Sequence, residues 1–159
     1  MASTTFSGPV TSTNGFITGS GSLVQITAAA TATNAKNAGR LNLFNIAAGA
    51  IVTLPAATGS GNQYNFAVQT TVTSNNYVVQ VANATDVMAG RAIIMQDAAD
   101  TVVGFETVAA SDTITLNGTT TGGTKGDTIY ITDIASGLFL VHCNLTGTGT
   151  EATPFSAAV

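Results

Sequence analysis

Short runs of β-branched and aromatic residues alternate with clusters of Gly, Asn, Ser and Pro along most of this chain. Each run is long enough for one strand and each cluster favours a turn, a pattern typical of an all-β sandwich or barrel. Strands are expected at residues 23–27, 41–46, 51–54, 63–69, 77–81, 92–95, 101–106, 113–116, 128–134 and 138–145. We therefore predict an all-β fold, a compact antiparallel β-sandwich or β-barrel.

Two of the expected strands alternate apolar and polar residues with the period of a half-buried strand. The apolar sets are Tyr64, Phe66 and Val68 in residues 63–69, and Phe139, Val141, Cys143 and Leu145 in residues 138–145. The alternation predicts that each set faces a core.

Turn residues suggest how some strands connect. Asn75 and Asn76 tolerate tight turns and predict that residues 77–81 pair back against residues 63–69. The tetrapeptide 134–137 ends in Gly and predicts a hairpin between the last two strands. One segment, residues 28–39, has enough Ala to favour a single helical turn.

The first 22 residues differ from the rest of the chain. They are Ser, Thr, Gly and Asn with irregularly spaced apolar residues, which are Phe6, Val10, Phe16 and Ile17. One interpretation is a disordered terminus, and the other is an extended arm whose apolar side chains are buried on a partner. We predict two parts, an arm at residues 1–22 and a single β domain at residues 23–159.

Scarcity of charge is the strongest compositional feature. Charged residues make up 8% of the chain, against about 25% in ordinary soluble domains. Hydrophobic residues make up 45%, yet no apolar run approaches the roughly 18 residues of a spanning helix, and the N-terminus lacks the pattern of a signal peptide. We therefore expect neither a membrane partner nor Sec export, and we expect the surface to be buried against neighbouring subunits.

Charge and cysteine content narrow the partners further. The net charge is -4, and the four basic residues, Lys36, Arg40, Arg91 and Lys125, are too scattered to form the basic stripe that binds phosphates. We therefore expect no nucleic-acid partner. Cys143 is the only cysteine, so an intramolecular disulfide is impossible and synthesis in a reducing cytoplasm is expected.

Three features suggest chemistry but fit a structural role better. The glycine-rich segment 118–126 lacks the Gly-Lys-Ser/Thr order of a phosphate loop, and we predict a flexible hairpin loop. His142 and Cys143 are neighbours on a strand, so their side chains should point to opposite faces. Asp97 and Asp100 flank a turn that we expect to be solvated. No catalytic, metal-binding or cofactor-binding residue is predicted, and we expect no cofactor and no enzymatic activity.

Two blocks of the chain resemble a known family. Residues 52–92, VTLPAATGSGNQYNFAVQTTVTSNNYVVQVANATDVMAGRA, and residues 111–157, which begin SDTITLNGTTTGGTKGDTIYI, are similar to small virion structural proteins of tailed bacteriophages and prophages. This resemblance implies a non-enzymatic virion component that decorates or cements the head. Some relatives carry more charge after the position of Lys125, where this chain has the nearly neutral residues 128–132.

The leading hypothesis is a capsid decoration protein on the outer head surface of a virion, made in the host cytoplasm. Its expected partners are the major capsid protein and two further copies of itself in a homotrimer. In this hypothesis Phe6, Val10, Phe16 and Ile17 contact the capsid. The alternative is a fibre or receptor-binding module of the tail or head, since Thr-rich and Gly-rich β proteins also form such parts.

Overall fold

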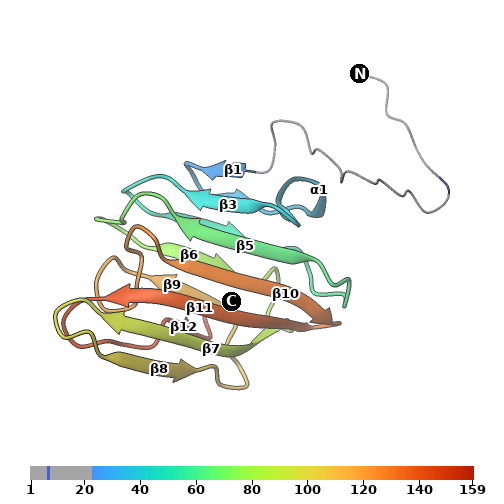
Figure 1. Ribbon diagram of the computed structural model, residues 1–159. Helices are drawn as coiled ribbons and strands as arrows, with labels where there is room; N and C mark the ends of the chain where they lie inside the picture. The colour runs from blue at the N-terminus through green and yellow to red at the C-terminus, as the bar shows by residue number, and fades with distance from the viewer. Residues whose placement is uncertain (1–6, 8–22) are drawn as a thin grey trace, which may run out of the picture.

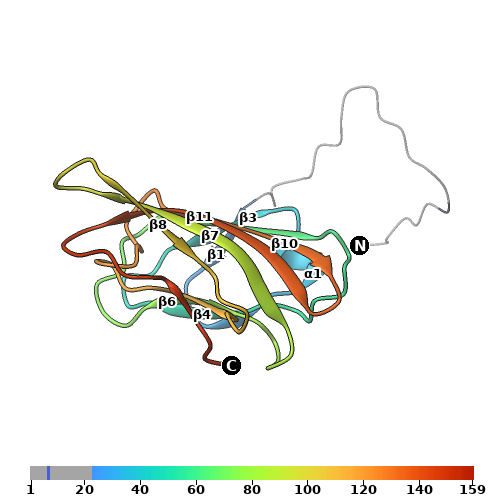
Figure 2. The same cartoon turned by 90° about the horizontal axis from the view of Figure 1, so that it is seen from below.

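The computed structural model describes Ser7 and residues 23–159, and it consists of two β-sheets packed face to face. Figure 1 views the larger sheet from its outer side, and Figure 2 shows the two sheets as separate layers. Apart from Ser7, the predicted arm lies outside the described residues, and so do its residues Phe6, Val10, Phe16 and Ile17. The prediction of an all-β sandwich is confirmed.

Each sheet draws strands from the whole described chain. The larger sheet has the order β1 (Leu23–Ile26), β3 (Leu41–Phe44), β5 (Gln63–Val68), β10 (Thr128–Ala135), β11 (Leu138–Gly147), β7 (Val87–Gln96) and β8 (Val102–Glu106). The smaller sheet has the order β12 (Phe155–Ser156), β9 (Thr113–Leu116), β6 (Tyr77–Gln80), β4 (Ala50–Thr53) and β2 (Ala30–Thr31).

The sequence predicts antiparallel sheets, but both sheets are mixed, with parallel and antiparallel pairs. The first six strands alternate between the two sheets, so the chain coils from one layer to the other. Each turn of this coil adds a parallel neighbour, which gives β1, β3 and β5 in one sheet and β2, β4 and β6 in the other. Parallel pairing requires such crossover connections, whereas the sequence pattern alone suggested short hairpins.

The predicted hairpin between residues 63–69 and 77–81 is wrong. The corresponding strands, β5 and β6, belong to different sheets. Asn75 does adopt a turn conformation, with φ of 40°. However, the backbone amides before it bond to other loops, since Val72 donates to Gly123 and Thr73 donates to Ala47. These bonds carry the chain across the sandwich, and Val72 is buried between the layers.

Three other local predictions agree with the structure. β10 and β11 form an antiparallel hairpin, and the apolar sets predicted on β5 and β11 are buried. A single helical turn, α1 (Asn34–Asn37), lies in the segment with helical propensity, where the Thr33 side chain accepts a hydrogen bond from the Lys36 amide. Thr33 is thus an N-cap, and Ser, Thr, Asn and Asp are favoured there.

Some elements were not visible in the sequence. β2 and β12 have two residues each, and the first half of β7 contains Ala89, Gly90 and Arg91, which do not read as a strand. Gly90 is required because a Cβ there would lie 1.9 Å from the Val141 carbonyl oxygen. The glycine-rich segment 118–126 joins β9 of one sheet to β10 of the other, so it is not the hairpin loop that was predicted.

The core is one cluster of apolar side chains from both sheets. At its centre the Phe44 ring stacks on Phe66 and Tyr77, with centroid distances of 5.6 Å and 4.4 Å. Such aromatic pairs contribute about 0.5–1.5 kcal/mol beyond the area they bury. The Tyr77 hydroxyl lies 2.6 Å from the Ile46 carbonyl and 2.7 Å from the Thr70 carbonyl, so its polar end has partners inside the sandwich.

Half of the acidic residues are inside the molecule. Of the eight acidic residues, four are buried, namely Asp86, Asp112, Asp127 and Asp133. Their partners are loop amides and neutral side chains. Asp127 accepts hydrogen bonds from the backbone amides of Gly123, Thr124 and Thr146. Asp86 accepts one from the Ala57 amide, and Asp112 accepts others from the amides of Ala158 and Val159.

Asp133 has the densest set of partners. Its carboxylate accepts backbone hydrogen bonds from Thr58, Gly59 and Ser60, the shortest being 2.7 Å from the Gly59 amide. The Ser60 hydroxyl adds a bond of 2.6 Å. Burial alone would raise the pKa of Asp133, but the hydrogen bonds from Ser60, Gly59 and Thr58 outweigh it and lower the pKa to about 2. The charged carboxylate therefore holds the loop after β4 against the end of β10.

Asp133→Asn should destabilise the fold by about 2 to 4 kcal/mol at pH 7, because the new amide N–H would oppose backbone donors. The folded-state pKa of Asp133 is lowered, so its contribution is present above the unfolded pKa of about 4 and is lost as pH falls toward about 2. Urea unfolding of both proteins at several pH values checks this. The difference in unfolding free energy should shrink between pH 4 and pH 2, and a constant difference would contradict the assignment.

Candidate interaction surface

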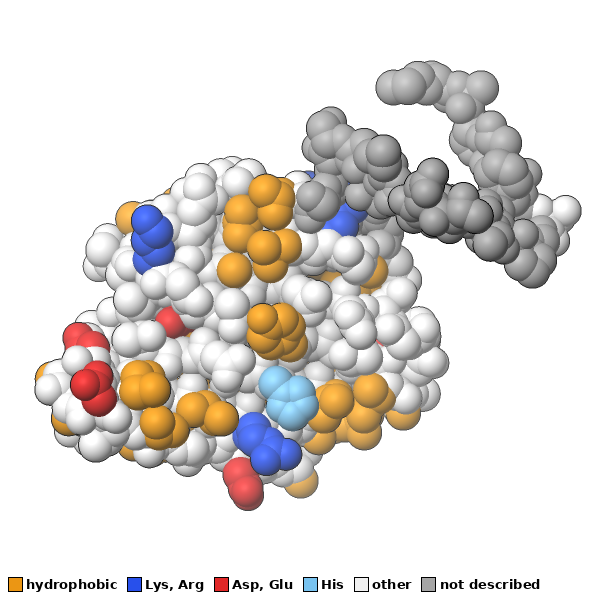
Figure 3. Space-filling model, in the orientation of Figure 1, with side chains coloured by type: hydrophobic (Ala, Val, Ile, Leu, Met, Phe, Trp, Pro, Cys, Tyr) orange, Lys and Arg blue, Asp and Glu red, His pale blue; other side chains and the backbone are white. Residues whose placement is uncertain are grey.

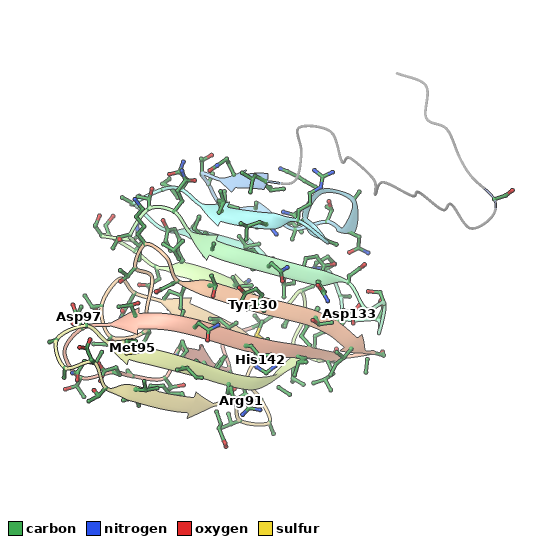
Figure 4. The ribbon with its side chains drawn as sticks, in the orientation of Figure 1. Arg91, Met95, Asp97, Tyr130, Asp133 and His142 are labelled. Atoms are coloured by element: carbon green, nitrogen blue, oxygen red, sulfur yellow. The ribbon has the colours of Figure 1, made fainter. Side chains whose placement is uncertain are left out.

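The outer face of the seven-stranded sheet, meaning the side chains that point away from the core, is aligned in transverse rows. The register places one residue from every strand in a central row, which consists of Leu23, Leu41, Asn65, Tyr130, His142, Arg91 and Glu106. Figure 4 shows Tyr130, His142 and Arg91 following one another across β10, β11 and β7. Alternation along each strand puts these side chains outside while their neighbours fill the core.

This outer face carries almost no charge. Arg91 and Glu106 are the charged residues on it, and they are cross-strand partners at the β8 margin. Asp133 is on β10 but points into the core. Elsewhere, Lys125 lies in the loop before β10 and Asp97 lies in the turn between β7 and β8. The burial of four aspartates also leaves the surface as a whole poorer in charge than the sequence suggests.

Apolar side chains gather on the same face. Figure 3 shows them over β1 and β3, over the middle of β10 and over β7, with His142 between these groups. The exposed large apolar residues of this face include Leu23, Leu41, Ile93, Met95, Val102 and Tyr130. Several exposed apolar groups on one face favour a contact site there, because large apolar patches on soluble proteins often mark interaction surfaces.

The smaller sheet has a different outer face. One row crosses all five of its strands and consists of Thr31, Thr53, Gln80, Thr113 and Ser156. Hydroxyl and amide groups dominate this row, and Ile51 is the large apolar side chain exposed on a neighbouring row. The two faces of the sandwich therefore differ in polarity, and the seven-stranded face is the better candidate for a dry contact.

The adjacent residues His142 and Cys143 point to opposite sides of β11, as predicted. His142 lies on the outer face, whereas Cys143 is buried in the core. Burial, followed by the charge of Asp127, raises the pKa of the Cys143 thiol to about 12. The thiol is thus protonated at neutral pH and is separated from the imidazole by the sheet.

Other candidate residues are also placed by the structure. Asp97 and Asp100 are both exposed at the turn between β7 and β8. Within residues 23–159 and Ser7, no three His, Cys, Asp or Glu side chains gather as a metal site would require. The segment 118–126 is followed by strand β10, not by the helix that a phosphate loop opens.

The surface hollows bring few reactive groups together. One lies beside β1 and α1 and contains Lys36, a second lies beside β7 and contains Asp127, and a third is lined by uncharged residues including Ile51. Each of these three hollows thus holds at most one ionisable side chain. None of these three hollows therefore brings an acid and a base together.

The predicted contact residues Phe6, Val10, Phe16 and Ile17 lie outside the described residues, so the structure does not place them. The outer face was missed by sequence reasoning, because its rows form from strands that are far apart in the chain. One signal was available: the polar positions of residues 138–145 include Leu138 and Leu140, which are too apolar for a solvated strand face.

Comparison of this chain with protein families, with curated proteins and with solved structures finds no match. Among the described residues, no helix has the length and apolar character needed to cross a membrane.

Cys143 should be inert in the folded protein. Its raised pKa reduces the thiolate by about a thousandfold relative to a free cysteine, and burial blocks access. Reaction with a chromogenic disulfide reagent at pH 8 should therefore be very slow in buffer and fast in concentrated urea. Rapid labelling without urea would show that β11 opens locally and would contradict the packed placement of this side chain.

Proposed function

We propose that this chain is a capsid decoration protein, which binds the outer surface of a bacteriophage head and stabilises the shell. The role is structural and not enzymatic. The partners are the major capsid protein and other copies of the chain, arranged as a trimer. In this proposal the protein is made in the host cytoplasm and resides on the virion surface.

The observation that supports this proposal best is the wide, nearly charge-free outer face of the seven-stranded sheet. Burying apolar surface contributes about 25 cal/mol per Å². A face with few charges loses little of this gain to desolvation, because burying an unpaired charge costs several kcal/mol. A shell that presents the same site many times would bind many copies through such a face.

Replacing Ile93 by Glu tests which face binds the shell. Ile93 is 43% exposed on the seven-stranded sheet, and Ile51, which is 46% exposed on the smaller sheet, offers a matched control. Ile93→Glu should reduce occupancy of undecorated capsids at least tenfold, since a buried carboxylate costs well over about 1.4 kcal/mol. Ile51→Glu should bind as the parent does. Pelleting with capsids measures both, and the reverse pattern would assign the contact to the smaller sheet.

The arm at residues 1–22 supplies a second contact in this proposal. Phe6, Val10, Phe16 and Ile17 would anchor an extended segment to a capsid subunit, with backbone hydrogen bonds to an exposed sheet edge. These anchors would add to the sheet face and set where on the shell the protein binds.

Deleting residues 2–18 should weaken capsid binding at least tenfold and leave the melting temperature nearly unchanged. The described residues 23–159 already form a core that spans both sheets, which is why stability should persist. Occupancy of capsids by the truncated protein, with its thermal melting curve as the control, measures the effect. Occupancy equal to that of the full chain would remove the arm from the proposal.

The alternative function, a fibre or receptor-binding module, is favoured by one observation. The exposed Tyr130 lies between Asn65 and His142 in the central row. An aromatic ring flanked by hydrogen-bonding side chains suits contact with a sugar. Copy number separates the two functions: hundreds of copies per particle favour decoration, and a few tens favour a fibre.

A further inference from the structure

Both margins of the seven-stranded sheet have an unpaired edge within residues 23–159. β1 pairs with β3, and β8 pairs with β7. The Asn45 amide donates to the Ile26 carbonyl at 3.0 Å, so Ile26 directs its backbone groups toward β3. In a parallel ladder the alternate residues face the other way, and these are Leu23 and Gln25.

The same reasoning applies to β8. Its ends are fixed by two bonds, from the Gln96 amide to the Thr101 carbonyl at 2.9 Å and from the Thr107 amide to the Gly90 carbonyl at 3.1 Å. In an antiparallel ladder such bonded pairs alternate with unbonded ones. The residues that direct backbone groups away from β7 are therefore Val102, Gly104 and Glu106.

The two edges have opposite directions. β1 is parallel to β3 and β5, β10 reverses that direction, β11 and β7 restore it, and β8 reverses it again. Figure 1 shows the arrows of β1 and β8 pointing opposite ways. A second copy displaced sideways in the plane of the sheet would thus bring its β1 antiparallel to β8, with both outer faces on the same side.

Gly104 at the middle of β8 has no contact within residues 23–159 that requires a glycine. The other glycines of the described region adopt a positive φ or, at Gly147, lie against neighbouring atoms. Gly104 does neither, because a Cβ built there would meet nothing within 4 Å. Glycine weakens a strand, and in a strand it often marks a site where another backbone approaches closely. Here that approach would come from outside the molecule.

We propose that copies of this chain join edge to edge, with β8 of one copy pairing antiparallel with β1 of the next. The contact uses different surfaces on the two copies, so it extends as a ladder when copies are only displaced and closes into a ring such as a trimer when each copy is also rotated. This proposal rests on the proposed function, because the contact would link neighbouring copies on the shell. The contact itself needs no shell.

The central row suggests the register of this contact. Leu23 and Glu106 are the two ends of that row, so a sideways displacement places them opposite each other. Antiparallel pairing then puts Gln25 of one copy opposite Gly104 of the next. The absent side chain of Gly104 would leave room for the Gln25 side chain on the outer face.

Trapping with introduced thiols tests this contact directly. Two single variants, Gln25→Cys and Gly104→Cys, are mixed at about 1 mM protein, comparable to the effective concentration of tethered neighbours, and oxidised. The native Cys143 is buried and should not interfere. The mixture should form a covalent dimer at least tenfold more than either variant alone. Mixing Gln25→Cys with Val108→Cys, which is exposed but outside β8, should not.

A variant that carries both Gln25→Cys and Gly104→Cys tests the geometry further. Within one chain, β1 and β8 are separated by six strand spacings of about 4.8 Å, or about 29 Å. Its introduced thiols can bond only between chains and should give trimers or longer ladders. No dimer from the mixed single variants would overturn the proposal. A dimer of Gly104→Cys alone in equal yield would replace it with β8–β8 pairing.

Gly104→Thr gives a second readout that a folding defect cannot imitate. Thr favours strands and has open space here, so the melting temperature should stay the same or rise. Covalent trapping through Leu23→Cys and Glu106→Cys, the neighbouring opposed pair in this register, should fall at least fivefold, while Ala109→Thr should leave it unchanged. Unchanged trapping with Gly104→Thr would count against close approach at this glycine. The assay contains no capsid, so its failure is separate from failure of capsid binding by Ile93→Glu.

Discussion

The hydrogen bonds from loop amides to buried aspartates are the interaction on which the rest of this structure depends. A chain that crosses repeatedly between two sheets must bury parts of its connections, and buried backbone amides without partners are costly. Asp133 accepts hydrogen bonds from the amides of residues 58–60, and Asp127 accepts them from the amides of residues 123–124, so each carboxylate fixes one loop. The same carboxylates are thereby removed from the surface, which leaves the exterior with fewer charges than the composition suggests.

The sequence was sufficient to predict strands and their buried faces, but not how the strands combine. Alternation in residues 138–145 reports local burial, and the structure confirms it. Partner choice depends on contacts distant in the chain, such as the bonds of the residue 69–74 segment, which send β6 to the other sheet. Asp133 was not recognised because an aspartate at the end of a strand resembles a solvated turn residue. Its signal was the distant run Thr58-Gly59-Ser60, whose amides converge on it.

The outer face, like the strand order, could not be predicted from the sequence. Each strand contributes between two and five side chains to it, and few of these are unusual alone. The central row becomes a surface only when the register aligns seven strands, with Tyr130 at its middle and Arg91 and Glu106 at one margin. Low charge in the sequence predicted that neighbours would cover the protein. The alignment of these residues indicates which face they would cover, because the smaller sheet presents hydroxyl and amide groups instead.

The proposed face and edge contacts differ in strength, and this difference bears on assembly. β1 has four residues, two of which direct backbone groups outward, so the edge contact has few hydrogen bonds. Each such bond contributes about 0.5–1.5 kcal/mol net, which is small beside the several kcal/mol lost when two proteins associate. The edge contact is therefore weak between free molecules. On a surface that already holds the protein by its sheet face, neighbours are present at effective concentrations of about 1 mM, and the same weak pairing becomes favourable. Assembly between copies would then follow binding to the shell, so that the shell and not the free protein determines where rings form.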